Sequence, residues 1–193
     1  MPADAQTANA LLRVLHERDP ELTGRLARTG ELASQVARHL GLSAADQAQV
    51  RQAAQLHDVG KLAVPDGILR QTSPLGPADW AFLQQCPTIG ERITAAAPAL
   101  AALAPLIRSS RERFDGTGYP DRLAGDQIPI GARIIAGCSA FVAMTSYRSY
   151  AATRTTAGAL EELAHSSGTR FDPVVVAALV EVLTAAEAAR AVR

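Results

Sequence analysis

Residues 29–61, TGELASQVARHLGLSAADQAQVRQAAQLHDVGK, decide the fold. The first part repeats small and apolar side chains at steps of three and four, which places them on one face of an α-helix: Thr29, Leu32, Ala33, Val36, Ala37 and Leu40. Gly41 ends this helix. Ser43 followed by Asp46 then resembles a capping box, which predicts a second helix running to about residues 56–57.

The helical period continues over the rest of the chain. Further helices are expected over 77–85, over 88–113 with a break near Pro98, over 130–146, and after the caps Thr156 and Asp172. Strand signals are weak, and only residues 61–64 and neighbouring short pieces could pair locally. We therefore predict an all-α bundle in which residues 1–24 form a lead-in helix and residues 25–193 form the domain proper.

The composition excludes several classes of function. The 193 residues fit one domain, and 48% hydrophobic and 20% charged residues are typical of a globular protein with a buried core. The formal net charge is zero, so we expect neither a nucleic-acid nor a membrane partner. The longest apolar stretch, residues 93–107, is broken by two prolines and is too short to span a bilayer. With no signal peptide apparent, the expected location is the cytoplasm.

The dipeptide His57-Asp58, followed by Val-Gly-Lys, lies at a predicted helix end. Adjacent helical residues point about 100° apart, so both side chains can bind one metal ion only at the seam between them. Alternatively, His57 lies on a core-facing stripe with Val50 and Ala54 and is a hydrogen-bonded core histidine. The dipeptide alone favours this second interpretation.

Its context indicates a family. The segments HDVGKLAVPDGIL (57–69), PLGPADWAFLQQCPTIGERI (74–93), RERFDGTGYPDRLAGDQIPIGARIIA (111–136), MTSYRSY (144–150) and GTRFDP (168–173) occur in this order. Together they resemble the HD-GYP family, whose members are all-α HD-domain phosphodiesterases of bacterial cyclic-di-GMP signalling. The resemblance covers roughly residues 10–183 and implies an HD-domain helical bundle of the HD-GYP type.

The resemblance also implies two or three metal ions, commonly iron or manganese, and here the ligands differ from the family pattern. His57 and Asp58 remain, whereas the other expected ligand positions hold Arg25, Cys86, Ser110, Arg111, Ser139 and Val142. We therefore expect no bound cofactor and no confident catalytic residue beyond the remnant pair. If a metal binds, an improvised zinc site would use His57, Asp58 and Cys86.

Two of the replacements are arginines, Arg25 and Arg111, which repel a metal ion but can pair with a carboxylate or phosphate. We predict that Asp58 pairs with one of them in the vacated space. The alternative is that both point to solvent.

Ligand binding does not require a metal. The resemblance places Lys61, the only lysine of the chain, and Arg148 near ligand phosphates. The candidate ligand-binding residues are therefore Lys61, Arg148, Tyr119, Arg25 and Arg111, with cyclic-di-GMP as the ligand. Equally, Lys61 could serve only to neutralise Asp58 or to cap a helix carbonyl.

The loop formed by Asp115, Gly116, Thr117, Gly118, Tyr119 and Pro120 retains the family pattern. Its two glycines permit unusual backbone torsions. It could pack only against its own domain, form a lip of a ligand pocket, or contact a diguanylate cyclase (GGDEF) domain or another signalling protein.

The first functional hypothesis is a degenerate, catalytically inactive HD-GYP domain that acts through protein contacts or nucleotide sensing. The alternative is a cyclic-di-GMP phosphodiesterase with residual metal-dependent activity. A third is a structural helical bundle that binds no nucleotide.

Overall fold

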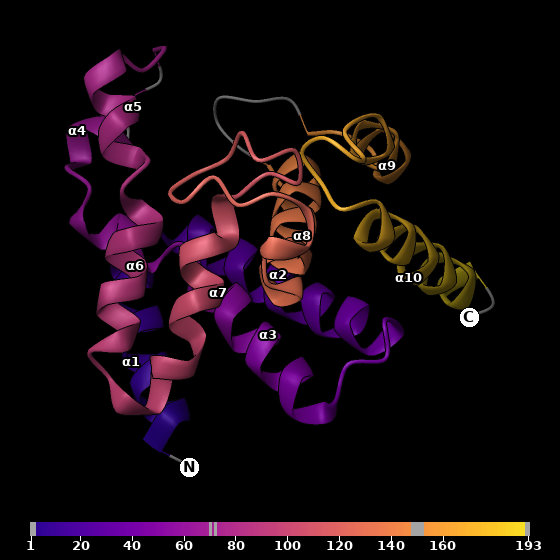
Figure 1. Ribbon diagram of the computed structural model, residues 1–193, viewed down its shortest axis with the longest axis horizontal. Helices are drawn as coiled ribbons and strands as arrows, with labels where there is room; N and C mark the ends of the chain where they lie inside the picture. The colour runs from indigo at the N-terminus through magenta and orange to yellow at the C-terminus, as the bar shows by residue number, and fades with distance from the viewer. Residues whose placement is uncertain (1–2, 70, 72, 148–152, 192–193) are drawn as a thin grey trace.

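The computed structural model describes residues 3–69, 71, 73–147 and 153–191 (Figure 1). Within these ranges the chain forms α-helices and short 3-10 helices and no β-strand, which confirms the all-α prediction. The α-helices are α1 (Ala3–Arg18), α2 (Pro20–His39), α3 (Ala44–Leu56), α4 (Asp66–Leu69), α5 (Pro77–Leu83), α6 (Cys86–Ala95), α7 (Ala104–Arg108), α8 (Ile130–Thr145), α9 (Thr156–His165) and α10 (Pro173–Ala191).

Helices α2 and α3 pack closely against each other, and α2 also packs against α8 (Figure 1). The α2 helix starts where the Asp19 carboxylate accepts a hydrogen bond of 2.8 Å from the Leu22 backbone N–H. Its predicted stripe is buried against α3 and α8. Gly41 turns the chain with a φ of 76°, and the Ser43 hydroxyl then accepts from the Asp46 N–H at 3.2 Å. The predicted cap is therefore confirmed.

The main core lies between α2, α3, α8 and α10 and contains Val36, Val50, Ile134 and Leu179, all fully or almost fully buried. A smaller apolar cluster joins Leu15, Leu22 and Leu26 to Val59, just after the His57-Asp58 pair. In Figure 1, α1, α4, α5 and α6 lie on one side of the central helices, and α9 and α10 lie on the other. The segment after α3 is thus held between α1, α2 and α6.

Two local predictions were wrong, and a third is confirmed only in part. Residues 61–64 do not pair as a strand but belong largely to a 3-10 helix, η1 (Val59–Ala63), in which the Lys61 N–H donates to the Asp58 carbonyl. The break predicted near Pro98 is present, but the later part of 88–113 is divided further into η2 (Pro98–Leu103), α7 and η3 (Ser109–Arg111), because Pro98 and Pro105 each lack a backbone donor. Thr155, not Thr156, caps α9.

Other elements match their predictions. The α8 helix spans the expected range to within one residue, and Asp172 caps α10 by accepting from the Val174 N–H at 2.8 Å. The predicted boundary between residues 24 and 25 falls inside α2, which runs continuously from Pro20.

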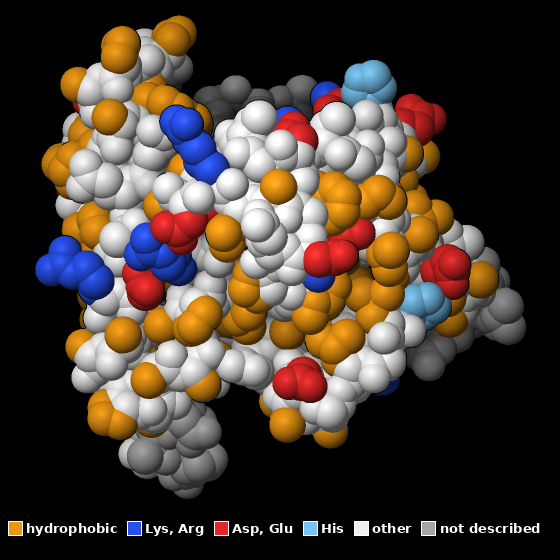
Figure 2. Space-filling view, in the orientation of Figure 1, with side chains coloured by type: hydrophobic (Ala, Val, Ile, Leu, Met, Phe, Trp, Pro, Cys, Tyr) orange, Lys and Arg blue, Asp and Glu red, His pale blue; other side chains and the backbone are white. Residues whose placement is uncertain are grey.

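No helix in the described part of the chain is long and apolar enough to cross a membrane. On the face in Figure 2, basic and acidic side chains are intermixed rather than gathered into one large field. This distribution agrees with the zero formal net charge.

Candidate functional site

The turn that carries His57 and Asp58 is held against α6 by a close backbone approach at Gly60. A Cβ atom at this position would lie 2.0 Å from the Cys86 carbonyl oxygen and 2.9 Å from the Gly90 nitrogen. Only glycine permits this distance, so the sequence His-Asp-Val-Gly fixes where the two polar side chains lie. Both line a cavity of about 610 Å³.

His57 is a buried, hydrogen-bonded histidine with 4% of its surface exposed. Its Nδ1 lies 2.7 Å from the Ala54 carbonyl oxygen, and a carbonyl can only accept, so Nδ1 carries the proton. The Nε2 atom is then the acceptor, and the Ser139 hydroxyl donates to it at 3.2 Å. Burial is the main cause that lowers the pKa of His57, which keeps the ring neutral at pH 7.

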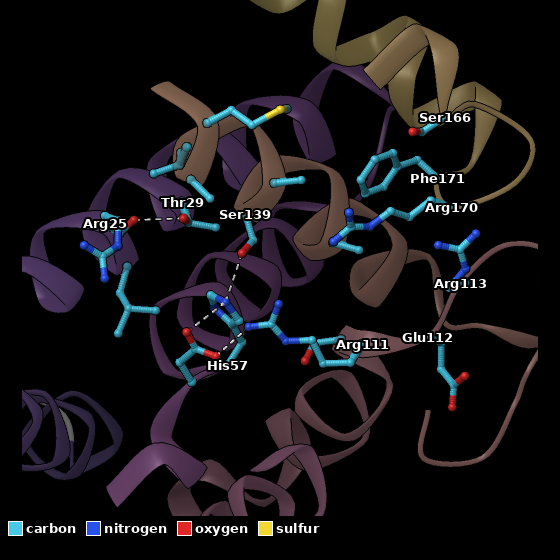
Figure 3. A pocket seen from close by; sticks show the side chains of 18 of the residues that line it. Arg25, Thr29, His57, Arg111, Glu112, Arg113, Ser139, Ser166, Arg170 and Phe171 are labelled. Atoms are coloured by element: carbon cyan, nitrogen blue, oxygen red, sulfur yellow. Dashed lines mark hydrogen bonds and ion pairs between the residues drawn. The ribbon is translucent and has the colours of Figure 1, made fainter. Parts of the chain in front are cut away.

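Asp58 is held by two cations. The Arg111 guanidinium donates to Oδ1 at 2.7 Å and the Lys61 ammonium donates to Oδ2 at 2.7 Å. Although burial alone would raise it, the charges of Lys61 and Arg111 hold the pKa of the Asp58 carboxyl well below its usual range. The predicted ion pair therefore forms with Arg111, and Lys61 contacts the same carboxylate. Figure 3 shows His57, Ser139 and Arg111 around this centre.

The side-chain atoms that could bind a metal ion at this centre are already used in contacts with other side chains. A metal would need the lone pair of His57 Nε2, which accepts from Ser139, and those of the Asp58 carboxylate, which accept from Lys61 and Arg111. The two side-chain cations would also repel it. Over the described ranges, no group of three or more His, Cys, Asp or Glu residues is arranged to hold a metal ion, so His57, Asp58 and Cys86 do not assemble as a ligand group.

The other positions at which the resemblance predicts metal ligands have separate local partners. Arg25 lines the cavity, but its ion pair is with Glu21 on the same helix, at 3.7 Å, and not with Asp58. The Ser110 hydroxyl donates to the Ile107 carbonyl at 2.8 Å. Cys86 is buried, and burial is the main cause that raises the pKa of its thiol. Arg148 lies outside the described residues.

The described lining of the cavity is rich in cations. Three acidic side chains, Asp58, Glu112 and Glu162, face six basic ones, Arg25, Lys61, Arg111, Arg113, Arg154 and Arg170. With His57 neutral, the excess is positive. A water-accessible hollow with this charge is suited to an anionic ligand.

The 115–120 loop forms one wall of the cavity through Tyr119. The Arg113 guanidinium binds the Asp115 carboxylate and the Thr117 hydroxyl, while a Cβ at Gly118 would lie 2.3 Å from the Arg113 nitrogen. The buried Glu112 carboxylate accepts from the Asp121 N–H at 2.7 Å. The loop is thus packed on its own domain and is also a lip of the pocket, whereas Asp115 and Thr117 remain exposed.

Among the residues that line the cavity, sequence reasoning did not propose Trp80 of α5, Arg113 or Arg170. Trp80 is half exposed. Arg113 and Arg170 lie inside the segments RERFDGTGYP and GTRFDP, so their positions were visible in the sequence. The sequence did not show that both side chains line the same cavity, because segments distant in the chain form it.

Comparison with known proteins identifies the family. Residues 9–175 match the family described as the HD domain. The chain belongs to this family. Its similarity to HD-GYP-type proteins confirms the resemblance inferred from the motifs.

Several relatives of this chain carry phosphodiesterase names, among them the following three. The cyclic di-GMP phosphodiesterase response regulator RpfG of Xanthomonas campestris is 36% identical over 179 residues, which cover 92% of this chain and 47% of that protein. A cyclic di-GMP phosphodiesterase of Thermotoga maritima is 35% identical, covering 89% and 47%. The 3'3'-cGAMP-specific phosphodiesterase 2 of Vibrio cholerae is 34% identical, covering 89% and 33%. This HD-domain chain therefore spans about half the length of these relatives or less.

Solved structures share the fold. Bd1817, an HDG"Y"P protein from Bdellovibrio bacteriovorus, superposes with a TM-score of 0.69 at 18% identity, over 84% of this chain and 52% of that one. The cyclic GMP-AMP specific phosphodiesterase V-cGAP3 of V. cholerae gives a TM-score of 0.66 at 20% identity, over 85% and 47%. Both neighbours support the HD-domain helical bundle.

Proposed function

We propose that this HD-domain chain binds a cyclic dinucleotide in the cavity and acts as a nucleotide-sensing, regulatory module without metal-dependent hydrolysis. The observation that carries the proposal is the Asp58 centre. Its carboxylate accepts from Arg111 and Lys61 at 2.7 Å each, in the place where the family resemblance implies a metal ion. Without a metal to activate water and offset developing charge, hydrolysis by the family's usual route is expected to be absent or very slow.

The cations that bind Asp58 can also serve a ligand. An ammonium has three N–H donors and a guanidinium has five, and the contacts to Asp58 use one donor of Lys61 and one nitrogen of Arg111. About a third of each side chain is exposed to the cavity side or solvent. Each can therefore donate to a phosphate oxygen while it neutralises the buried carboxylate. The cyclic dinucleotides named for the relatives carry phosphates of this kind.

Two predicted elements complete the proposal. Arg148 is proposed as a further phosphate contact. The exposed tip of the 115–120 loop is proposed to contact a GGDEF domain or another signalling protein, because Arg113 holds Asp115 and Thr117 in one arrangement at the surface. A loop with a fixed shape loses little conformational entropy when a partner binds.

A second function is favoured by the names of the relatives. Proteins 34–36% identical to this chain are phosphodiesterases, so residual metal-dependent hydrolysis of a cyclic dinucleotide is the alternative. In this alternative, a metal ion must displace Arg111 and Lys61 from Asp58, and Ser139 from His57 Nε2.

The two functions are separated by metal content, turnover and binding measured on one preparation. Metal analysis follows purification with and without added manganese or iron, and product formation from cyclic-di-GMP is measured in the same buffers. The T. maritima phosphodiesterase serves as the positive control for the assay. We expect no stoichiometric metal, no linear product and measurable calorimetric binding of cyclic-di-GMP. Stoichiometric metal with turnover would establish the alternative instead, and absence of both turnover and binding would contradict both.

A further inference from the structure

Nearly every cation that faces the cavity is paired with a carboxylate. The pairs are Lys61 and Arg111 with Asp58, Arg113 with Asp115, Arg154 with Glu162, and Arg25 with Glu21. Arg170 is the exception, because its side chain forms no hydrogen bond and no ion pair with any residue that the structure describes. Its guanidinium only lies near the Phe171 ring, 5.2 Å from the ring centroid.

The backbone of Arg170 is fixed beside the loop that forms the cavity lip. The Phe114 N–H donates to the Arg170 carbonyl at 3.3 Å, and the Asp115 N–H donates to the Thr169 carbonyl at 2.8 Å. The side chain projects from the connection between α9 and α10 into the cavity (Figure 3). The backbone of Arg170 is therefore held in place at the cavity, while its side chain is partly exposed to solvent.

Arg170 also lies close enough to Arg113 and Arg111 to feel their charges. Burial lowers the pKa of Arg170 most, and the charges of Arg113 and Arg111 lower it further. Three arginines thus line the same cavity, and of these only Arg111 and Arg113 have carboxylate partners among the described residues. A bound anion would relieve this repulsion and use donors that are otherwise unsatisfied by protein.

We infer that Arg170, flanked by Arg113 and Arg111, forms a second phosphate subsite on the wall made by the α9–α10 connection. The inference rests on the proposed nucleotide-sensing function and deepens it. A cyclic dinucleotide has two phosphates, and one is assigned to Lys61 and Arg111 at the Asp58 centre. The other lies against the Arg170 fork, whose planar donors match a phosphate in bidentate geometry. Ligand binding therefore links the α3 end of the cavity to the α9–α10 connection.

The test compares calorimetric affinities for cyclic-di-GMP and for inorganic pyrophosphate. Arg170→Gln removes the charge, whereas Arg170→Lys keeps the charge but removes the planar guanidinium that can donate two parallel hydrogen bonds. Arg13→Gln is the matched control, because Arg13 is exposed on α1 and lies outside the cavity. We expect Arg170→Gln to weaken both probes by roughly ten- to a hundredfold, the size of a hydrogen bond to a charged group. Arg170→Lys should recover part of the loss, and Arg13→Gln should match the parent. An unchanged melting temperature for Arg170→Gln excludes unfolding as the cause.

Each outcome separates the subsite from the wider function. If the parent binds cyclic-di-GMP and Arg170→Gln binds both probes equally well, the subsite is overturned and nucleotide sensing stands. If pyrophosphate binding depends on Arg170 while cyclic-di-GMP does not bind, the subsite stands and the dinucleotide function is overturned. Binding of neither probe by the parent overturns both.

Discussion

Replacement of Arg111 by methionine removes one of the two cations on Asp58 while keeping an unbranched chain of similar length. Breaking a fully buried ion pair by removing one partner costs about 3–5 kcal/mol, and losing a hydrogen bond to a charged group costs about 1.5–3 kcal/mol. Asp58 is buried, with 8% of its side chain exposed, but Arg111 is 32% exposed and Lys61 remains at 2.7 Å. We therefore expect Arg111→Met to lower the free energy of unfolding by about 2 kcal/mol.

A double-mutant cycle isolates the interaction. Urea unfolding at pH 7 is measured for the parent, Arg111→Met, Asp58→Asn and the double variant, with metal chelator present throughout. Without a charge at position 58, the same loss of Arg111 should cost less than about 0.5 kcal/mol, which gives a coupling energy of about 1.5 kcal/mol. For a chain of this size, the single variant should melt about 4–8 °C below the parent.

The matched control is Arg113→Met, which breaks the nearby Arg113–Asp115 pair. Its two side chains are 37% and 26% exposed, so screening by water limits the loss to about 1 kcal/mol or less. The interpretation of the Asp58 centre is refuted if Arg111→Met costs the same in the Asp58→Asn background as in the parent. It is equally refuted if the two arginine variants are equally destabilised.

Three further predictions concern pH, packing and metal. Burial lowers the pKa of His57 in the folded chain below its ordinary value of 6.5. The contribution of the neutral ring to stability is therefore complete above pH 6.5, and it is lost as the pH falls below 6.5 towards the folded pKa, by up to about 1.4 kcal/mol per pH unit. Between pH 5 and 7, the free energy of unfolding in urea should fall less steeply for His57→Gln than for the parent. Gly60→Ala should cost more than about 2 kcal/mol because its Cβ would meet the Cys86 carbonyl at 2.0 Å, while Gly67→Ala, which meets nothing within 4 Å, should cost less than about 0.5 kcal/mol in the same assay. Dialysis against a chelator should leave the melting temperature unchanged by calorimetry, and a clear decrease would indicate a bound structural metal.

The differences from the family pattern form one consistent electrostatic change. Where the resemblance implies a carboxylate and a histidine binding a metal ion, Arg111 and Lys61 supply positive charge to Asp58, and Ser139 supplies a donor to His57 Nε2. Both buried groups are therefore satisfied by protein atoms. These hydrogen bonds and ion pairs stabilise the turn after α3 without a metal, because a buried carboxylate with no partner would be strongly unfavourable.

Local sequence patterns predicted the helices well, because caps and apolar stripes act over three or four residues. The Ser43 cap, the buried face of α2 and the Asp172 cap all follow from such short-range interactions. The strand expected at 61–64 failed because the backbone there bonds locally, with the Lys61 N–H on the Asp58 carbonyl. The cap of α9 is Thr155 and not the adjacent Thr156, because the Thr155 hydroxyl accepts from the Gly158 N–H.

By itself, the sequence determined the family and the all-α class, since these depend only on which residues occupy ordered motifs. Only the tertiary structure decided which arginine binds Asp58, and that Ser139 bonds His57, because these partners are 53 and 82 residues apart. It also decided that Arg170 faces the same cavity, through backbone bonds to the 114–115 segment. Short-range patterns specify helices, whereas the pairing of distant charges depends on how those helices pack.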